Sequence, residues 1–109
     1  MSIPHIPVLR LGRPYESLEH YKVKDHRTGD TKAVVSLIHS GIIKRDLHNI
    51  AASRAALNKF TVAQLIKMSA QAGELFLNGT LPLGDKGHTQ SPQEYVETLG
   101  LTSGLPHVM

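Results

Sequence analysis

The chain has 109 residues, of which 40% are hydrophobic and 19% are charged, so it has the size and composition of one small domain or part of one. It contains no cysteine, which excludes a disulfide framework, a thiolate metal site and a cysteine nucleophile. The formal net charge is +3, but the basic residues stand singly and without interleaved aromatic side chains, so nucleic-acid binding is not expected.

The sequence has no apolar run of about 18 residues, and its first residues lack the basic and apolar regions of a signal peptide. We therefore expect a cytoplasmic protein that does not enter a membrane. Residues 1–19 are predicted to form an extended arm and a turn, because Pro4 and Pro7 oppose a helix and Gly12 allows the chain to reverse.

Residues 20–39 are predicted to form a β-hairpin. Tyr21 and Val23 alternate with lysines, and a run rich in β-branched residues follows over 33–38. Gly29 lies between the two segments and suits the positive φ that a hairpin loop requires. The second strand is apolar on both faces, so we expect it to be covered on both sides.

Residues 40–79 are predicted to form an antiparallel pair of amphipathic helices. Ser40 is the expected N-cap of the first helix, which continues to Leu57. Its apolar residues fall along one stripe, with Ala51 beside it: Ile43, Leu47, Ile50 and Leu57.

The second helix has the clearest start signal in the sequence. Thr61 is predicted as its N-cap, with Gln64 completing a capping box and Phe60 packing on Leu65. Asn78 and Gly79 mark its end. Apolar residues cover about half of its circumference, which is wider than the stripe of an ordinary surface helix. This helix is therefore expected to need cover from more than one direction.

This apolar side is the predicted protein interface. Its candidate residues are Leu65, Met68, Ala72, Gly73 and Phe76. Gly73 either permits close approach of another backbone or is a tolerated glycine that costs about 1 kcal/mol relative to alanine. We expect an apolar patch larger than several hundred Å² to stay exposed on the isolated chain.

Arg54 is a further interface candidate, because it lands inside the apolar stripe of the first helix. It either reaches an acidic partner across an interface or extends to solvent near the helix C-terminus, where its charge complements the helix dipole.

Residues 80–109 are predicted to contain a loop, a short helix and a tail. Proline and glycine favour a loop over residues 80–90. Ser91 as N-cap, Pro92 at the first helical position and Glu94 two residues later predict a third helix that runs to Leu99 and ends at Gly100. The tail, residues 102–109, has no end signal, so we expect it to belong to a longer polypeptide. The predicted fold class is α+β and mainly helical, as one domain or part of one.

The sequence predicts no catalytic, cofactor or metal site. No two of the seven histidines have the i, i+4 spacing of a helical metal pair. Asp85 stands where the lysine of a phosphate loop would be, and there is no Gly-x-Ser-x-Gly or Gly-x-Gly-x-x-Gly motif.

The order of elements resembles one protein family. Residues Lys24–Val35 look like the N-terminal hairpin of the aldehyde dehydrogenase superfamily, with a strand, a Thr-Gly-Asp turn and a returning strand. Two amphipathic helices follow in that family, as predicted here over residues 42–77. Residues 72–85 and 91–96 are similar to an acyl-reductase-like branch of the superfamily.

The resemblance implies an oxidoreductase that binds NAD or NADP in a Rossmann-like domain and attacks an aldehyde with a cysteine. None of those motifs is present, so no catalytic or cofactor residue is carried over to this chain. The expected role is a non-catalytic segment that packs on the cofactor domain and contributes to oligomerisation, with protein as its partner. The alternative is a small self-associating helical adaptor or regulatory module.

Overall fold

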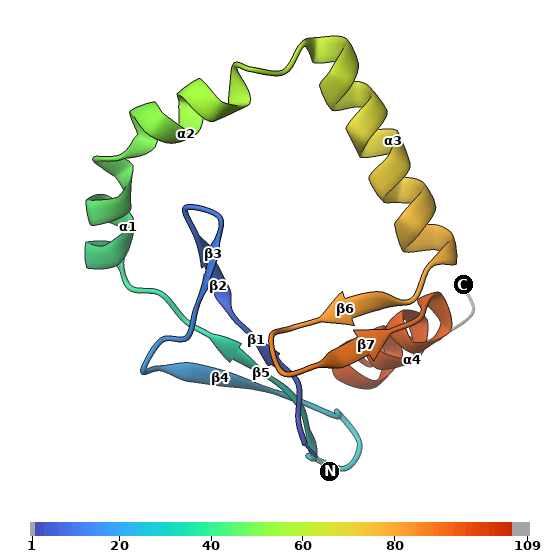
Figure 1. Cartoon of the computed structure of the whole chain (residues 1–109). Coiled ribbons are helices and arrows are strands. Elements are labelled where there is room, and N and C mark those ends of the chain that lie inside the picture. The colour runs from blue at the N-terminus through green and yellow to red at the C-terminus, as the bar shows by residue number, and fades with distance from the viewer. Residues whose placement is uncertain (1, 106–109) are drawn as a thin grey trace.

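The computed structural model describes residues 2–105. Within this range the chain forms four helices and seven short strands, so that 43% is helical and 24% is strand in three small sheets (Figure 1). The class is α+β, but the expectation of a mainly helical fold is wrong. The reason is that two segments expected as an arm and a loop each pair into strands.

The predicted hairpin is confirmed. Strand β4 (His20–Lys24) pairs antiparallel with β5 (Thr31–Ser36), and Gly29 has a φ of 78° in the connection. The buried carboxylate of Asp25 accepts a 2.8 Å hydrogen bond from the backbone N–H of Arg27. The hairpin turn is therefore fixed by its own side chains.

The N-terminal arm is extended as predicted, but it joins other strands. Strand β1 (His5–Ile6) lies parallel to β5 and gives the sheet order β1-β5-β4. Beyond it, β2 (Val8–Arg10) and β3 (Arg13–Tyr15) form a second hairpin. Leu11 and Gly12 both have positive φ, 51° and 80°, which matches the tight turn that joins two twisted strands.

The first predicted helix is broken in two. Helix α1 (Ser40–Leu47) has His39 as its N-cap, and α2 (Ile50–Leu57) begins after Asn49. At the break, the amides of His48 and Asn49 bond three residues back, to the carbonyl oxygens of Arg45 and Asp46. These tighter turns end α1, so the helix predicted from Ser40 to Leu57 is not continuous.

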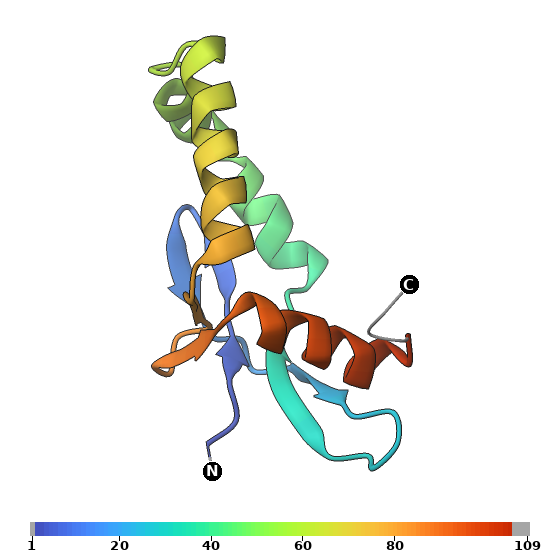
Figure 2. The same cartoon turned by 90° about the vertical axis from the view of Figure 1, so that its right-hand side faces the viewer.

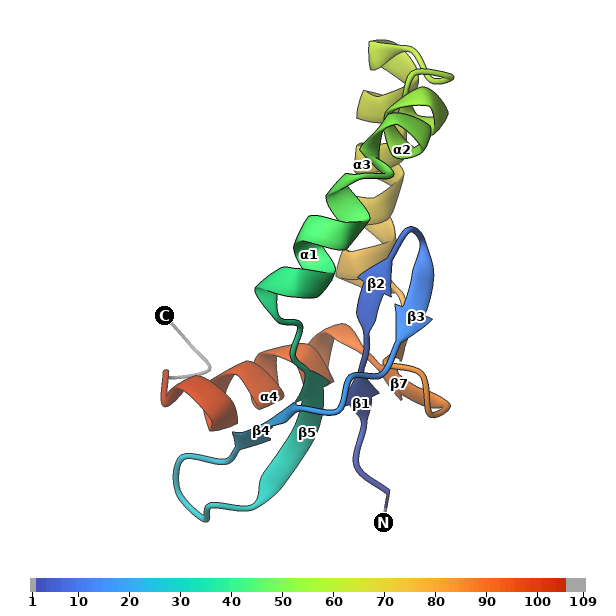
Figure 3. The same cartoon turned by 90° about the vertical axis from the view of Figure 1, so that its left-hand side faces the viewer.

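Helix α3 (Val62–Asn78) has the predicted start and end. Thr61 Oγ1 accepts from the Gln64 amide at 3.1 Å, and Gln64 Oε1 accepts from the Thr61 amide at 2.8 Å. The expected antiparallel helix pair is not formed. Figure 1 shows α1 and α2 rising on one side and α3 descending on the other, and Figure 3 shows the same succession from the side. We call α1, α2 and α3 the arch.

The predicted loop over residues 80–90 contains a third hairpin, of β6 (Leu81–Leu83) and β7 (His88–Gln90). Helix α4 (Pro92–Ser103) has the predicted Ser91 and Glu94 capping box, but it continues past Gly100 and ends at Gly104 with a φ of 77°. Its extra turn is held because the backbone N–H of His26 donates to the Leu101 carbonyl at 2.8 Å.

Helix α4 packs beside β4 and the foot of α3, as Figure 2 shows. We call the three-stranded sheet, the β6-β7 hairpin and α4 the base. The predicted tail is helical through Ser103, and residues 106–109 lie outside the described range.

The molecule is more open than a compact domain. Its radius of gyration is 16.9 Å, whereas a compact chain of this length has about 13 Å. Its accessible surface is 8670 Å², against about 6000 Å² for a compact monomer of this mass. Over residues 2–105 no apolar side chain is buried, and the buried side chains are His5, Ser17, Asp25 and Ser36. No described helix is long and apolar enough to cross a membrane.

Candidate functional site

The arch exposes a row of large apolar side chains. On α3, 73% of Val62, 66% of Ile66 and 68% of Leu77 is exposed. The other exposed apolar residues along the arch are Ile43, Leu47, Ile50, Leu57, Phe60, Met68, Leu75 and Phe76. We expected this helix to need cover from more than one direction, and over residues 2–105 much of its apolar side is exposed. Such surface is normally removed from water by a neighbour.

The predicted interface residues on α3 lie on this surface. Leu65 is half-buried, and Met68, Ala72 and Gly73 are exposed. Phe76 is exposed but meets the ring of Tyr95 on α4 edge to face, with centroids 5.0 Å apart. A Cβ added at Gly73 would have no heavy atom within 4 Å among the described residues. The close backbone approach considered for Gly73 is therefore not made inside residues 2–105.

Arg54 lies exposed in the last turn of α2. It does not join the α3 residues in one cluster, because α2 and α3 occupy different limbs of the arch (Figure 1). Both interpretations of Arg54 stay predictions.

One ion pair ties the foot of the arch to the β2-β3 hairpin. Arg10 donates two hydrogen bonds of 2.7 Å to the carboxylate of Asp46 on α1, and its guanidinium lies 4.8 Å from the centre of the Tyr15 ring. The hydrogen bond from Arg10 holds the pKa of Asp46 below its usual range. Because two N–H groups of Arg10 bond the two oxygens of Asp46, the pair fixes the orientation of the guanidinium as well as its distance from the carboxylate.

A buried hydrogen-bond network holds the base together. His5 Nδ1 lies 2.8 Å from Asp85 Oδ1, and His5 Nε2 lies 2.7 Å from Ser36 Oγ. Since a carboxylate only accepts, Nδ1 carries the hydrogen and donates to Asp85, which holds the pKa of Asp85 below its usual range. The Ser17 amide donates to Ser36 Oγ at 3.2 Å. The network joins β1, β5 and the β6-β7 turn.

Ser36, His5 and Asp85 are bonded in the order of a hydrolase triad, but the serine is placed for structure. Ser36 is only 5% exposed, and its oxygen is already engaged by His5 and the Ser17 amide. A nucleophilic serine has to reach a substrate carbonyl beside donors that stabilise the oxyanion. Here the hydroxyl satisfies buried polar neighbours.

Gly84 brings the β6-β7 turn against β1. It has a φ of 71°, and a Cβ added there would lie 2.0 Å from the His5 carbonyl oxygen. The next amide, that of Asp85, donates to the same oxygen at 3.1 Å. Asp85 thus contacts His5 through both its backbone and its side chain. This close approach requires a glycine at position 84.

Sequence reasoning found the apolar face of α3 but missed the His5 network. The apolar face repeats within a single helix. In the network, by contrast, Ser36 and Asp85 lie 31 and 80 residues after His5. The local signal here is the glycine content near Gly84, which predicts only a loop.

Comparisons of the chain with protein families, curated proteins and solved structures found no match. The resemblance to aldehyde dehydrogenases therefore rests on the residues quoted above.

Proposed function

We propose that this chain is a non-catalytic packing and oligomerisation segment of an aldehyde dehydrogenase-like NAD(P)-dependent oxidoreductase. The observation that carries the proposal is the arch, whose large apolar side chains are exposed along three successive helices. The elements of the base are joined by hydrogen bonds to one another, so we expect a protein partner to bind the arch and not the base. NAD or NADP would be bound by the cofactor domain of the parent protein.

The amount of surface supports an extensive contact. The chain exposes about 2700 Å² more than a compact monomer of its mass would. One side of a standard protein interface needs only about 800 Å². The excess surface of the chain is therefore larger than one side of a standard interface.

The order of elements supports the family part of the proposal. A hairpin with a Thr-Gly-Asp turn is followed by helices, as in the aldehyde dehydrogenases that the sequence resembles. A self-sufficient adaptor would be expected to bury an apolar core of its own, and no described apolar side chain is buried.

The first experiment tests the surface. Sedimentation velocity of the chain should show self-association that depends on concentration, together with binding of a hydrophobic dye. Met68→Glu should weaken association roughly tenfold, about 1.4 kcal/mol, because it buries a charge in the contact.

Gln71→Glu is the matched control, since it adds the same charge to the polar side of α3 and keeps a good helix former. We expect it to associate like the wild type. A chain that stays monomeric at high concentration and binds no dye would contradict the proposed interface.

The second experiment tests the family. The gene is read downstream of the codon for residue 109. A continuing frame with a cysteine nucleophile and a dinucleotide-binding motif would support the proposal. A frame that ends there, in a chain that still self-associates, would favour the adaptor.

A further inference from the structure

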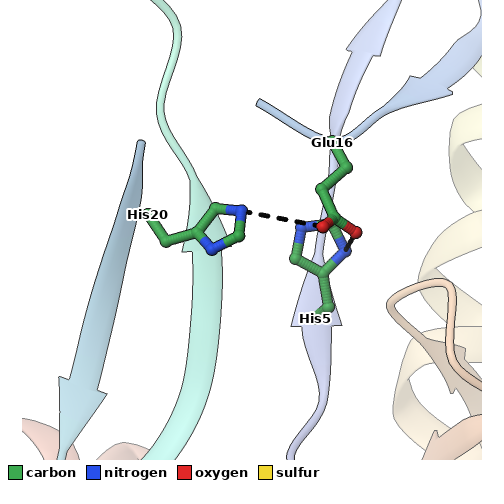
Figure 4. Close-up of side chains that lie close together, drawn as sticks. All are labelled: His5, Glu16 and His20. Atoms are coloured by element: carbon green, nitrogen blue, oxygen red, sulfur yellow. Dashed lines mark ion pairs between the residues drawn. The ribbon is translucent and has the colours of Figure 1, made fainter. Parts of the chain in front are cut away.

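We propose that His5, Glu16, His20 and Asp85 form a binding site for a divalent metal ion of the zinc class. Imidazole nitrogen and carboxylate oxygen are donors that zinc accepts in proteins. The first three residues each offer a ligand atom, and these atoms lie within 4.8 Å of one another. Figure 4 shows the His20 ring directed at the Glu16 carboxylate, which lies against the His5 ring.

The distances are close to those of a metal site. His5 Nδ1 lies 3.7 Å from Glu16 Oε1, and His20 Nε2 lies 3.9 Å from Glu16 Oε2. The same His5 nitrogen lies 2.8 Å from Asp85 Oδ1. Around a tetrahedral zinc ion, neighbouring ligand atoms are about 3.3 Å apart. The three distances therefore differ from that spacing by less than about an ångström, with Asp85 placed beside His5 as the fourth donor.

The second nitrogen of His5 fits this role. Its Nε2 is bonded to Ser36 Oγ at 2.7 Å, which fixes the ring with Nδ1 facing the carboxylates. Histidine ligands of metals are usually oriented in this way by a partner on the other nitrogen. To bind a metal through the lone pair of Nδ1, His5 would take the tautomer with its hydrogen on Nε2, which would then donate to Ser36 Oγ.

The ligand residues differ in how far their side chains are exposed to solvent. His5 is buried, with 6% of its side chain exposed, so its position is set by the fold. Glu16 and His20 are 48% and 34% exposed, which leaves an open side for an ion to enter. A bound ion would join β1, the segment before β4, β4 itself and the β6-β7 turn.

Lys86 is the group that competes with the metal. Its Nζ lies 3.4 Å from Glu16 Oε1, and 54% of its side chain is exposed. A cation entering the site has to displace this ammonium from the carboxylate. Removing the lysine charge should therefore strengthen metal binding, an effect that a chance histidine site elsewhere would not show.

The test is calorimetric titration of the full chain with ZnCl₂, with Co²⁺ absorption reporting four-coordinate nitrogen and oxygen ligands. We expect one ion per chain. His20→Ala should weaken binding roughly tenfold or more, since loss of even an outer partner costs about 10–100-fold. Glu16→Gln should act in the same direction while keeping shape and hydrogen bonding.

Lys86→Met should tighten binding roughly two- to fivefold, the range that an exposed ion pair contributes. His48→Ala is the matched control, because it removes a histidine between α1 and α2, far from the cluster. Far-UV circular dichroism shows whether each variant keeps its fold.

The proposal is overturned if the wild type gives no binding heat with excess zinc. It is also overturned if His48→Ala weakens binding as much as His20→Ala, or if folded Glu16→Gln binds like the wild type. None of these results affects the interface proposed for the arch, which is tested without metal.

Discussion

Polar side chains are buried in the base, whereas large apolar side chains are exposed along the arch. In the base, His5, Ser36 and Asp85 meet across long stretches of sequence and satisfy one another. In the arch, α3 is defined by a capping box within four residues and by its own backbone bonds. The base is held by contacts among the described residues, whereas the arch leaves large apolar side chains exposed.

The difference shows how a small chain can be ordered without a conventional core. Buried polar groups hold their partners because leaving one unpaired costs about 1–3 kcal/mol. A helix alone gains little from its local bonds and depends on packing for most of its stability. We therefore expect changes in the base to cost more than changes in the arch, and the predictions follow in order of expected size.

The largest effect is expected for Gly84→Ala. The added Cβ would lie 2.0 Å from the His5 carbonyl oxygen at a φ of 71°. The left-handed conformation and the overpacking together should destabilise the base by about 3 kcal/mol. Urea denaturation measures this loss, and hydrogen exchange should place it at β1 and β5. An unchanged midpoint would mean that the β6-β7 turn does not contact β1.

Ser36→Ala should cost about 1–3 kcal/mol, because it leaves His5 Nε2 and the Ser17 amide without a partner. The matched control is Ser69→Ala on α3, where the exposed hydroxyl donates only to the Leu65 carbonyl of its own helix. We expect the control to be near neutral in the same denaturation experiment. Equal losses at the two serines would remove the contrast between base and arch.

Thr61→Ala should cost about 1 kcal/mol by removing the cap of α3. Its effect should be confined to the arch, so amides in the first turn of α3 should exchange faster while those of β5 do not change. Thr80→Ala, at an exposed position outside the helices, serves as the control. A spread of the effect into β5 would show that arch and base unfold together.

Gly73→Ala should stabilise α3 in the isolated chain by up to about 1 kcal/mol, since the new methyl group has open space around it. The free energy of unfolding should therefore rise in Gly73→Ala, whereas it should fall in Gly84→Ala. The helical signal in circular dichroism and its thermal midpoint measure the gain. If the wild type self-associates through this face, Gly73→Trp should weaken association. A loss of helix in Gly73→Ala would contradict the exposed position of Gly73.

The smallest effect is expected at the ion pair between the arch and the β2-β3 hairpin. Because Arg10 lowers the pKa of Asp46 in the folded chain, the pair stabilises the fold above the ordinary aspartate pKa of about 3.9. That stabilisation is lost as the pH falls through the lower, folded value. Asp46→Asn should reduce the acid dependence of the thermal midpoint, whereas Asp30→Asn should not. Identical acid slopes in both variants would exclude this role for Asp46.

The apolar face of α3 can be predicted from the sequence because it is a local pattern, and its role as an interface stays a prediction. Leu65, Met68, Ala72, Gly73 and Phe76 recur at helical spacing, and all but the half-buried Leu65 are exposed because α3 meets α4 only at its foot. The His5 cluster had no such pattern. Its members come from β1, β5 and two connections, so only the assembled sheet places them together.

The sequence by itself determined the features that depend on neighbours a few residues away. These are the capping boxes at Thr61 and Ser91, the end of α3 at Gly79 and the hairpin turn at Gly29. Tertiary contacts decided the rest. Strand β1 is a strand because β5 offers it a free edge, and α4 passes Gly100 because His26 bonds to Leu101. Helix α1 ends at Leu47 although the apolar spacing continues to Leu57, and its last turn is tied to β2 by the Arg10 and Asp46 pair. Tertiary contacts of this kind can outweigh a local preference worth less than about 1 kcal/mol per residue.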